Sequence, residues 1–211
     1  MSVKILICDD HAIVREGLKQ IINDASDLEV TAEADSGGSA IRQVEDDKFD
    51  VVVLDISLPD QSGLDVLKQL KQIQPNLPVL MLSIHPEEFY ATRVLRANAS
   101  GYLTKRSAPS ELVTAIRTVA QGRKYITASL AEKLADSFDG VNQPPHQKLS
   151  DREYQVLIEL ARGNTISEIA ENLNLSVNTI STYRSRILEK MNLNNTAELI
   201  HYAIRNKLVD S

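Results

Sequence analysis

The sequence predicts an α/β protein with a doubly wound, five-stranded parallel sheet, followed by a second, smaller all-α domain of four helices. Three observations support this prediction. Over residues 1–125, short apolar runs alternate five times with segments of helical periodicity. Most of these runs are nearly continuous, as is typical of strands buried on both faces of a sheet. From residue 148 onward only helical spacing remains.

The predicted strands span residues 3–8, 28–34, 51–55, 78–83 and 101–105. A segment with helical spacing of apolar residues follows each strand, and the predicted helices span residues 12–24, 38–47, 64–73, 87–98 and 109–121. The third strand, VVVLD, is a continuous apolar run that ends in Asp55. Short connections and right-handed crossovers place all five strands parallel in one sheet.

Residues 126–147 differ from what precedes them. A brief helical pattern over residues 128–138 is followed by DGVNQPPHQ. Adjacent prolines with Gly, Asn and Gln are typical of a linker. The sequence therefore predicts one domain over residues 1–125, a linker with a short helix, and a second domain over residues 148–211.

Four short helices are predicted in the second domain. A capping box, in which Ser or Thr is followed three residues later by Glu, begins the first helix at Ser150 and the second at Thr165. The tight break at Asn174 and Leu175, between the second and third helices, suits a helix-turn-helix.

Composition limits the classes of protein that fit. The chain has 211 residues and a formal net charge of −6. Residues 148–211 carry eight basic and eight acidic residues, so any binding of nucleic acid depends on a local patch. The single cysteine, Cys8, reads as a small buried residue, and with no signal peptide it favours the cytoplasm. No apolar run approaches the roughly 20 residues that cross a bilayer, so no membrane contact is expected.

Polar side chains follow the strands at one edge of the predicted sheet. Asp9 and Asp10 follow the first strand, Asp55 ends the third, Ser83 ends the fourth, and Lys105 follows the fifth. The carboxyl ends of parallel strands share one edge, so these side chains converge. Three carboxylates repel one another unless a cation lies between them, and Mg²⁺ suits an all-oxygen set of ligands. A cation, a nucleophilic carboxylate and a lysine are what phosphoryl transfer needs.

Each of these residues also has a purely structural interpretation. A strand-end aspartate can cap a turn, and a lysine can be a solvated surface charge. The coincidence of four strand ends favours the site. Asp55 is the candidate nucleophile because it ends a central strand, Asp10 is the more direct metal ligand, and Asp9 is a second ligand.

The strand-end motifs resemble those of the receiver domain of two-component response regulators, a flavodoxin-like fold. These motifs are DD at 9–10, D…LP…G at 55–63, Ser83 and Lys105. DDHAIVREGL (9–18) and GYLTK (101–105) resemble the NarL/FixJ family in particular. Residues 149–191 resemble the LuxR-type helix-turn-helix domain of the same family. The resemblance covers nearly the whole chain except the linker.

The resemblance implies a role for each site residue. Asp55 would accept a phosphoryl group from a sensor histidine kinase, and Lys105 would pair with that group. Ser83 would hydrogen-bond it, and Tyr102 would follow as an aromatic switch. The implied Mg²⁺ ligands are Asp9, Asp10, Asp55 and the backbone carbonyl of Ser57.

The chain departs from similar proteins after Lys105. Many of them have a proline there, preceded by a cis bond, whereas this chain has Arg106. A cis bond before a non-proline residue costs about 3 kcal/mol, so we expect a trans bond and a more mobile loop. His85, two residues after Ser83, is expected to be a solvated loop histidine, with a general base as the weaker alternative.

The third helix of the second domain is the candidate DNA reader. A helical wheel places Val177, Ile180, Ile187, Leu188 and Met191 on its inward face. The predicted DNA-binding residues are Asn178, Thr179, Ser181, Thr182, Tyr183, Ser185, Arg186 and Lys190. The alternative is an ordinary solvated face. Arg184 falls inward, and a carboxylate from Glu153 or Glu168 is its expected partner.

The function implied is a transcription regulator whose phosphorylation at Asp55 switches dimerisation and promoter binding. Its implied partners are a histidine kinase, double-stranded promoter DNA and a second copy of the chain, with RNA polymerase as a further candidate. The last helix, 196–207, would form the dimer face. Apart from its own phosphoryl transfer and dephosphorylation, no enzymatic activity is expected.

Two alternatives remain open. One is an aspartate-nucleophile phosphohydrolase, although such enzymes usually have a second aspartate where this chain has Ser57. The other is an adaptor whose helical domain binds protein.

Overall fold

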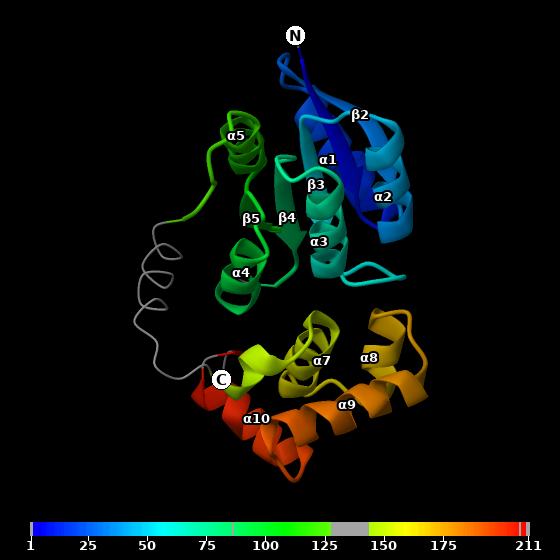
Figure 1. Cartoon of the computed structure of the whole chain (residues 1–211), viewed down its shortest axis with the longest axis vertical. Coiled ribbons are helices and arrows are strands. Elements are labelled where there is room, and N and C mark those ends of the chain that lie inside the picture. The colour runs from blue at the N-terminus through cyan, green and yellow to red at the C-terminus, as the bar shows by residue number, and fades with distance from the viewer. Residues whose placement is uncertain (1, 86, 128–143, 207, 210–211) are drawn as a thin grey trace. The chain divides into compact units, whose positions relative to one another are not determined.

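The chain folds into two units. The computed structural model describes every residue except 1, 86, 128–143, 207 and 210–211. Within it, the chain divides into Met1–Ala135 and Asp136–Ser211 (Figure 1). The helix predicted over residues 128–138 lies outside the described residues.

The first unit contains the predicted parallel sheet. Its strands are β1 (Val3–Cys8), β2 (Leu28–Ala34), β3 (Val51–Asp55), β4 (Val79–Ser83) and β5 (Gly101–Thr104). They are hydrogen-bonded in the order β2-β1-β3-β4-β5, and every pair is parallel. This order places β3 at the centre of the sheet. β5 ends one residue earlier than predicted, so Lys105 lies just beyond it.

Helices separate the strands as predicted. They are α1 (Ala12–Asn23), α2 (Gly37–Asp46), α3 (Gly63–Ile73), α4 (Glu87–Arg96) and α5 (Pro109–Ala120). Side chains of α1 and α5 form one hydrophobic core with the sheet; it includes Ile22, Leu112, Ile116, Ile5, Ile7, Val51, Val53, Leu80 and Leu103. Alternate strand residues such as Leu6, Val52 and Met81 are also fully buried, so both faces of the sheet are covered.

Gly63 positions the loop that follows β3. A Cβ atom at this residue would lie 2.1 Å from the backbone oxygen of Asp55, which only glycine avoids. The Gly63 N–H donates to the backbone oxygen of Ile56 at 2.8 Å. Since the start of α3 packs directly against the end of β3, Asp55 is held on a fixed backbone.

The second unit contains a short 3₁₀ helix, η1 (Pro145–Lys148), followed by α7 (Asp151–Ala161), α8 (Ile166–Asn172), α9 (Val177–Met191) and α10 (Thr196–Arg205). Both capping boxes are present. Asn174 has a left-handed backbone with φ of 53°, which makes the tight break between α8 and α9. The predicted helix-turn-helix is therefore confirmed in its local structure.

The inward face of α9 was predicted with one error. Ile180, Ile187 and Met191 are buried, but Val177 is 49% exposed. A helical wheel gives the direction of a side chain, not how far the neighbouring helices extend. Val177 occupies the first turn of α9 and is left in contact with solvent.

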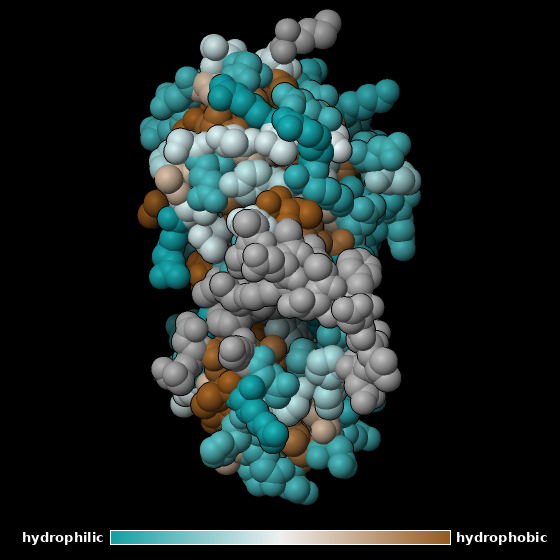
Figure 2. Space-filling view, turned by 90° about the vertical axis from the view of Figure 1, so that its left-hand side faces the viewer, coloured by the Kyte–Doolittle hydropathy of each residue, from teal (hydrophilic) through white to brown (hydrophobic). Residues whose placement is uncertain are grey.

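The surface, the single cysteine and the helix lengths agree with the expectations from composition. Figure 2 shows hydrophilic side chains over much of the visible surface, with small hydrophobic patches among them. Cys8 is buried, and burial raises the pKa of its thiol, as expected of a packing residue. Among the described residues, no helix has the length and apolarity to cross a membrane.

Candidate functional site

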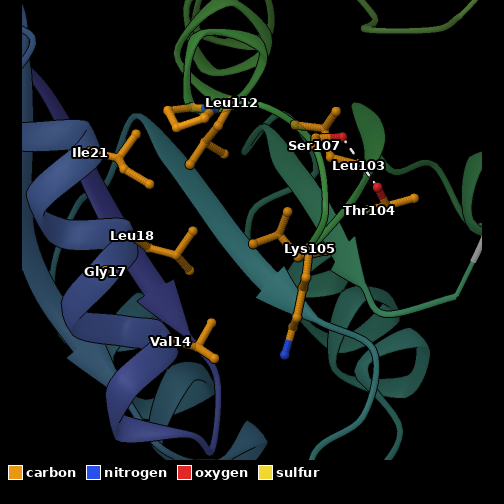
Figure 3. Close-up of a pocket in the computed structure, with 11 residues that line it drawn as sticks. Val14, Gly17, Leu18, Ile21, Leu103, Thr104, Lys105, Ser107 and Leu112 are labelled. Carbon is orange, nitrogen blue, oxygen red and sulfur yellow. Dashed lines mark hydrogen bonds between the residues drawn. The ribbon is translucent and has the colours of Figure 1, made fainter.

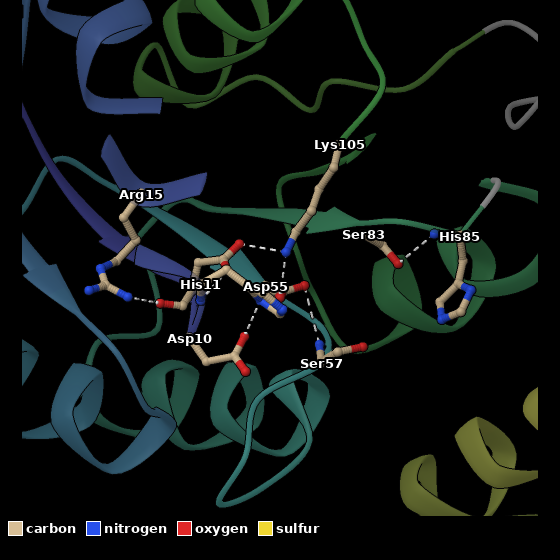
Figure 4. Close-up of polar contacts among 9 residues, drawn as sticks. Asp10, His11, Arg15, Asp55, Ser57, Ser83, His85 and Lys105 are labelled. Carbon is tan, nitrogen blue, oxygen red and sulfur yellow. Dashed lines mark hydrogen bonds and ion pairs between the residues drawn. The ribbon is translucent and has the colours of Figure 1, made fainter. Parts of the chain in front are cut away.

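Three acidic residues and a lysine converge at the carboxyl edge of the sheet (Figure 4). Lys105 Nζ lies 2.7 Å from Asp55 Oδ2 and 2.5 Å from Asp9 Oδ2. Asp9 and Asp55 are almost fully buried, whereas Asp10 is exposed. The convergence expected from the strand ends is thus present, and β1, β3 and the end of β5 provide it.

Burial dominates the electrostatics of Asp55. It raises the pKa of this carboxyl, the Asp9 charge raises it further, and Lys105 opposes both, with the result that the pKa is about 6. Burial alone would lower the pKa of Lys105, but the Asp55 and Asp9 carboxylates more than compensate and raise it. The site therefore keeps Lys105 charged beside the Asp55 carboxyl, whose ionised form is disfavoured by burial.

This shift predicts a pH dependence of stability. The pKa of Asp55 is about 6 in the fold against an ordinary value of 3.8, so its ionisation destabilises the metal-free fold. The contribution of Asp55 to stability is complete below about pH 4 and is lost as pH rises through 6. Two pKa units correspond to roughly 2–3 kcal/mol.

We expect the wild type in a chelator to lose about 2 kcal/mol more of its free energy of unfolding between pH 4 and pH 7 than Asp55→Asn, whose side chain stays neutral. Urea unfolding followed by circular dichroism at each pH measures this difference. Parallel pH profiles of the two proteins would contradict it.

The donor set of the acidic cluster fits a divalent cation. Asp9, Asp10, His11 and Asp55 each offer a ligand atom, and all four atoms lie within 4.8 Å of one another. Asp9 Oδ2 is buried and forms an ion pair with the Lys105 ammonium at 2.5 Å. Carboxylate oxygens are the ligands that Mg²⁺ prefers, so the donor set suits this ion. His11 was absent from the residues predicted here.

Ser57 faces Asp55 through its backbone. Its N–H donates to Asp55 Oδ1 at 3.2 Å, while Lys105 holds Asp55 Oδ2. The two bonds fix the plane of the carboxylate. The role of the Ser57 carbonyl as a metal ligand stays a prediction.

Ser83 and Tyr102 are both tied to His85 in the loop after β4. The His85 N–H donates to Ser83 Oγ at 3.1 Å, and the Tyr102 hydroxyl donates to the His85 carbonyl at 2.8 Å. The His85 ring stacks on Tyr90 and is buried. The expectation of a solvated histidine was wrong, because the ring packs on Tyr90 and the backbone is held by Ser83 and Tyr102. This loop is thereby coupled to the two residues expected to respond to phosphorylation.

Lys105 also borders a cavity of about 190 Å³ between α1 and α5, lined mainly by apolar side chains. Figure 3 shows the Lys105 stem beside the cavity and its ammonium directed away from it.

No peptide bond in the described part of the chain is cis, so the bond before Arg106 is trans, as expected. The mobility of that loop stays a prediction.

Asp60 is a further residue that sequence reasoning missed. Its carboxylate accepts hydrogen bonds from the N–H groups of Gly37 and Gly38, at 2.9 and 2.8 Å. Burial opposes these bonds, but they lower the pKa of Asp60 overall. The loop after Asp55 is therefore anchored to the first turn of α2.

The predicted DNA-binding residues all lie on α9, and none of them is buried. Several of their hydroxyls bond within the helix: Thr182 donates to the Asn178 carbonyl, and Ser185 to the Ser181 carbonyl. Thr179 shares a hydrogen bond with Ser176, which caps the helix. These hydroxyls can still accept further bonds.

Lys190 and Arg186, the two cations among the predicted DNA-binding residues, differ in their ion pairing. Lys190 Nζ lies 2.6 Å from Glu153 Oε2, so its charge is paired within the unit. Burial works against the ionised form of Glu153, but Lys190 and the Ser150 cap lower its pKa overall. Arg186 is exposed and has no ion pair with any residue that the structure describes. Arg186 is consequently the stronger candidate for meeting DNA.

The expected partner of Arg184 was wrong. Its Nε donates to the Thr196 hydroxyl at 2.7 Å, at the start of α10. The two glutamates named for it have other partners: Glu153 binds Lys190, and Glu168 caps α8 at Thr165. Arg184 links α9 to α10.

Comparisons with known proteins agree with this geometry. The family model "Response regulator receiver domain" matches residues 5–117, and "Bacterial regulatory proteins, luxR family" matches residues 147–203. The chain is 35% identical to the response regulator UvrY of Escherichia coli K12, covering 99% of this chain and 97% of that protein. It is 36% identical to the response regulator GacA of Pseudomonas syringae pv. syringae, with 99% of each covered.

A solved structure is also similar. RcsB of Salmonella enterica serovar Typhimurium, bound to the promoter rprA in the presence of a phosphomimetic, has a TM-score of 0.65 and 26% identity. The match covers 96% of this chain and 98% of that one.

A parallel α/β domain with an acidic cluster beside a lysine, followed by a helix-turn-helix domain, defines a two-component response regulator that acts on transcription. Within that class, the chain belongs to the NarL/FixJ family, with a receiver domain and a LuxR-type DNA-binding domain.

Proposed function

We propose that Asp55 accepts a phosphoryl group from a sensor histidine kinase, and that this event controls dimerisation and the binding of α9 to promoter DNA. The observation that carries the proposal is the buried Asp55 carboxylate at the end of the central strand, held by the Lys105 ammonium at 2.7 Å. The proposed domains are residues 1–125 and 148–211, joined by residues 126–147.

The site residues divide the chemistry among them. An Asp55 carboxylate oxygen attacks phosphorus in line with the leaving group, and Lys105 pairs with the oxygens of the incoming phosphoryl group. Asp9, Asp10, Asp55 and the Ser57 carbonyl would hold Mg²⁺, which when bound offsets charge on the phosphoryl oxygens. The receiver thus catalyses only its own phosphorylation and dephosphorylation.

The response begins in the loop after β4. A phosphoryl group adds nearly two negative charges and three strong acceptors beside Ser83. The Ser83 hydroxyl, which now accepts from His85 N–H, donates to that group. Since Tyr102 is bonded to the His85 carbonyl, a shift of Ser83 is passed to Tyr102 through this loop.

The output is carried by α9. The α9 helix enters the major groove, where Asn178, Ser181 and Arg186 meet base edges or phosphates. Two copies bring two such helices to an inverted-repeat site. The α10 helix, with Ile204 41% exposed, supplies the dimer face. RNA polymerase is a candidate partner at the promoter.

Selection of bound DNA from a random pool tests this function. Wild-type protein treated with acetyl phosphate and Mg²⁺ is expected to enrich an inverted repeat. Asp55→Ala is expected to enrich it far less. An adaptor would enrich no sequence, and a phosphohydrolase would instead show continuous turnover of a phosphate ester; either result would contradict the proposal.

Arg186→Ala is expected to weaken operator binding about tenfold and to reduce the salt dependence, as a slope of log affinity, by about 1. The reason is the loss of an exposed cation that forms no ion pair with the described residues of the unit. Gel shifts at several salt concentrations measure both quantities.

The matched comparison is Lys190→Ala. Its effect is expected to be smaller, because Glu153 already binds the Lys190 ammonium. A larger loss of affinity in Lys190→Ala than in Arg186→Ala would contradict this assignment.

A further inference from the structure

His11 lies against the acidic cluster but has no role in the function proposed above. It follows Asp10 directly and occupies the N-cap position of α1. N-cap side chains usually accept a hydrogen bond from the first turn of the helix, but the His11 side chain makes no such bond. The imidazole is exposed and turns toward the carboxylates.

The distances between these side chains suit a shared cation. His11 Nδ1 lies 2.7 Å from Asp10 Oδ1 and 3.3 Å from Asp9 Oδ1 (Figure 4). Adjacent ligands of an octahedral ion with bonds of about 2.1 Å lie roughly 3 Å apart. The two distances from His11 Nδ1 therefore have the spacing of neighbouring ligands on one octahedral ion.

The buried Asp9 carboxylate is fixed beside His11. Asp9 is 1% exposed, and its Oδ2 lies 2.5 Å from the Lys105 ammonium, an ion pair without hydrogen-bond geometry. The other oxygen of this carboxylate, Oδ1, accepts the His11 N–H at 2.9 Å. The same residue thus orients one Asp9 oxygen through its backbone and places a nitrogen donor beside it.

We propose that His11 is a nitrogen ligand that shifts the metal preference of this site from Mg²⁺ toward transition-metal ions such as Mn²⁺. Mg²⁺ prefers oxygen ligands and keeps its waters, whereas imidazole nitrogen suits first-row transition metals. His11 therefore determines metal specificity. The inference rests on the proposed metal site but adds a ligand that the carboxylates do not require.

Two measurements on the full chain test His11 directly. Pulsed electron paramagnetic resonance of bound Mn²⁺ is expected to show coupling to an imidazole nitrogen in the wild type and none in His11→Gln. Calorimetry with Mn²⁺ and with Mg²⁺ is expected to show the Mn²⁺-to-Mg²⁺ affinity ratio falling roughly tenfold in His11→Gln, the lower end of what loss of one metal-supporting residue costs. His201→Gln, which changes an exposed histidine on α10, is the control and should match the wild type.

The outcomes separate His11 from the site as a whole. Asp10→Ala is expected to weaken the binding of both ions. If Asp10→Ala does so but His11→Gln leaves the ratio and the nitrogen coupling unchanged, the His11 inference is overturned and the metal site stands. If the wild type binds neither ion, both the inference and the proposed metal site are overturned.

Discussion

Asp55→Asn is expected to reduce phosphoryl incorporation from acetyl phosphate by roughly 10³-fold or more, the scale seen when a nucleophile is removed. The amide has the shape of the carboxylate but cannot attack phosphorus at neutral pH. Asp9, the other buried carboxylate of the site, is held by Lys105 and by the His11 N–H. Mass spectrometry of the intact protein over time measures the incorporation.

The matched control is Asp65→Asn. Asp65 lies in the first turn of α3, ten residues from Asp55, and its side chain is 47% exposed and pairs loosely with Lys68 at 3.5 Å. Its replacement should leave incorporation unchanged. Incorporation by Asp55→Asn at the rate of the control would show that the acceptor is another residue.

Lys105→Ala is expected to slow phosphorylation by about 10²-fold, the usual cost of removing one preorganised charge-stabilising donor. The ammonium now lies within 2.7 Å of two buried carboxylates, so its loss leaves Asp9 and Asp55 facing each other without a protein cation. The Asp55 pKa would then rise further, and less of the nucleophile would be ionised at neutral pH.

Initial rates at saturating Mg²⁺ measure this effect, with the exposed Lys68→Ala as the control. Rates for Lys105→Ala within twofold of the wild type would exclude a role for the ammonium in the transfer. A normal rate only at higher pH would instead support the effect of Lys105 on Asp55 ionisation.

The sheet and the convergence of its strand ends could be predicted because both follow from short-range patterns. A short apolar run such as VVVLD favours a buried strand. The topology of a parallel sheet then brings Asp9, Asp55 and Lys105 to one edge. The capping boxes at Ser150 and Thr165 could also be predicted, because each joins residues only three positions apart.

Contacts between side chains that lie far apart in the sequence were not predicted. Lys190 and Glu153 are 37 residues apart, and no spacing rule joins them. Arg184 donates to a threonine 12 residues later, at the start of α10, and no local pattern indicates that partner. Burial of His85 depends on the path of a loop, which periodicity does not describe. His11 could have been suspected from its place beside two aspartates, since a histidine there adds a nitrogen donor to the set.

The central claim is that the charge state of Asp55 governs DNA binding. The most direct test compares the affinity of the full chain for its selected operator with and without acetyl phosphate and Mg²⁺, in the wild type and in Asp55→Asn. The wild type is expected to bind about tenfold more tightly after phosphorylation, within the usual range of coupling between two sites, and Asp55→Asn is expected not to change. An equal gain in Asp55→Asn, or no gain in wild-type protein shown by mass to be phosphorylated, would contradict the claim.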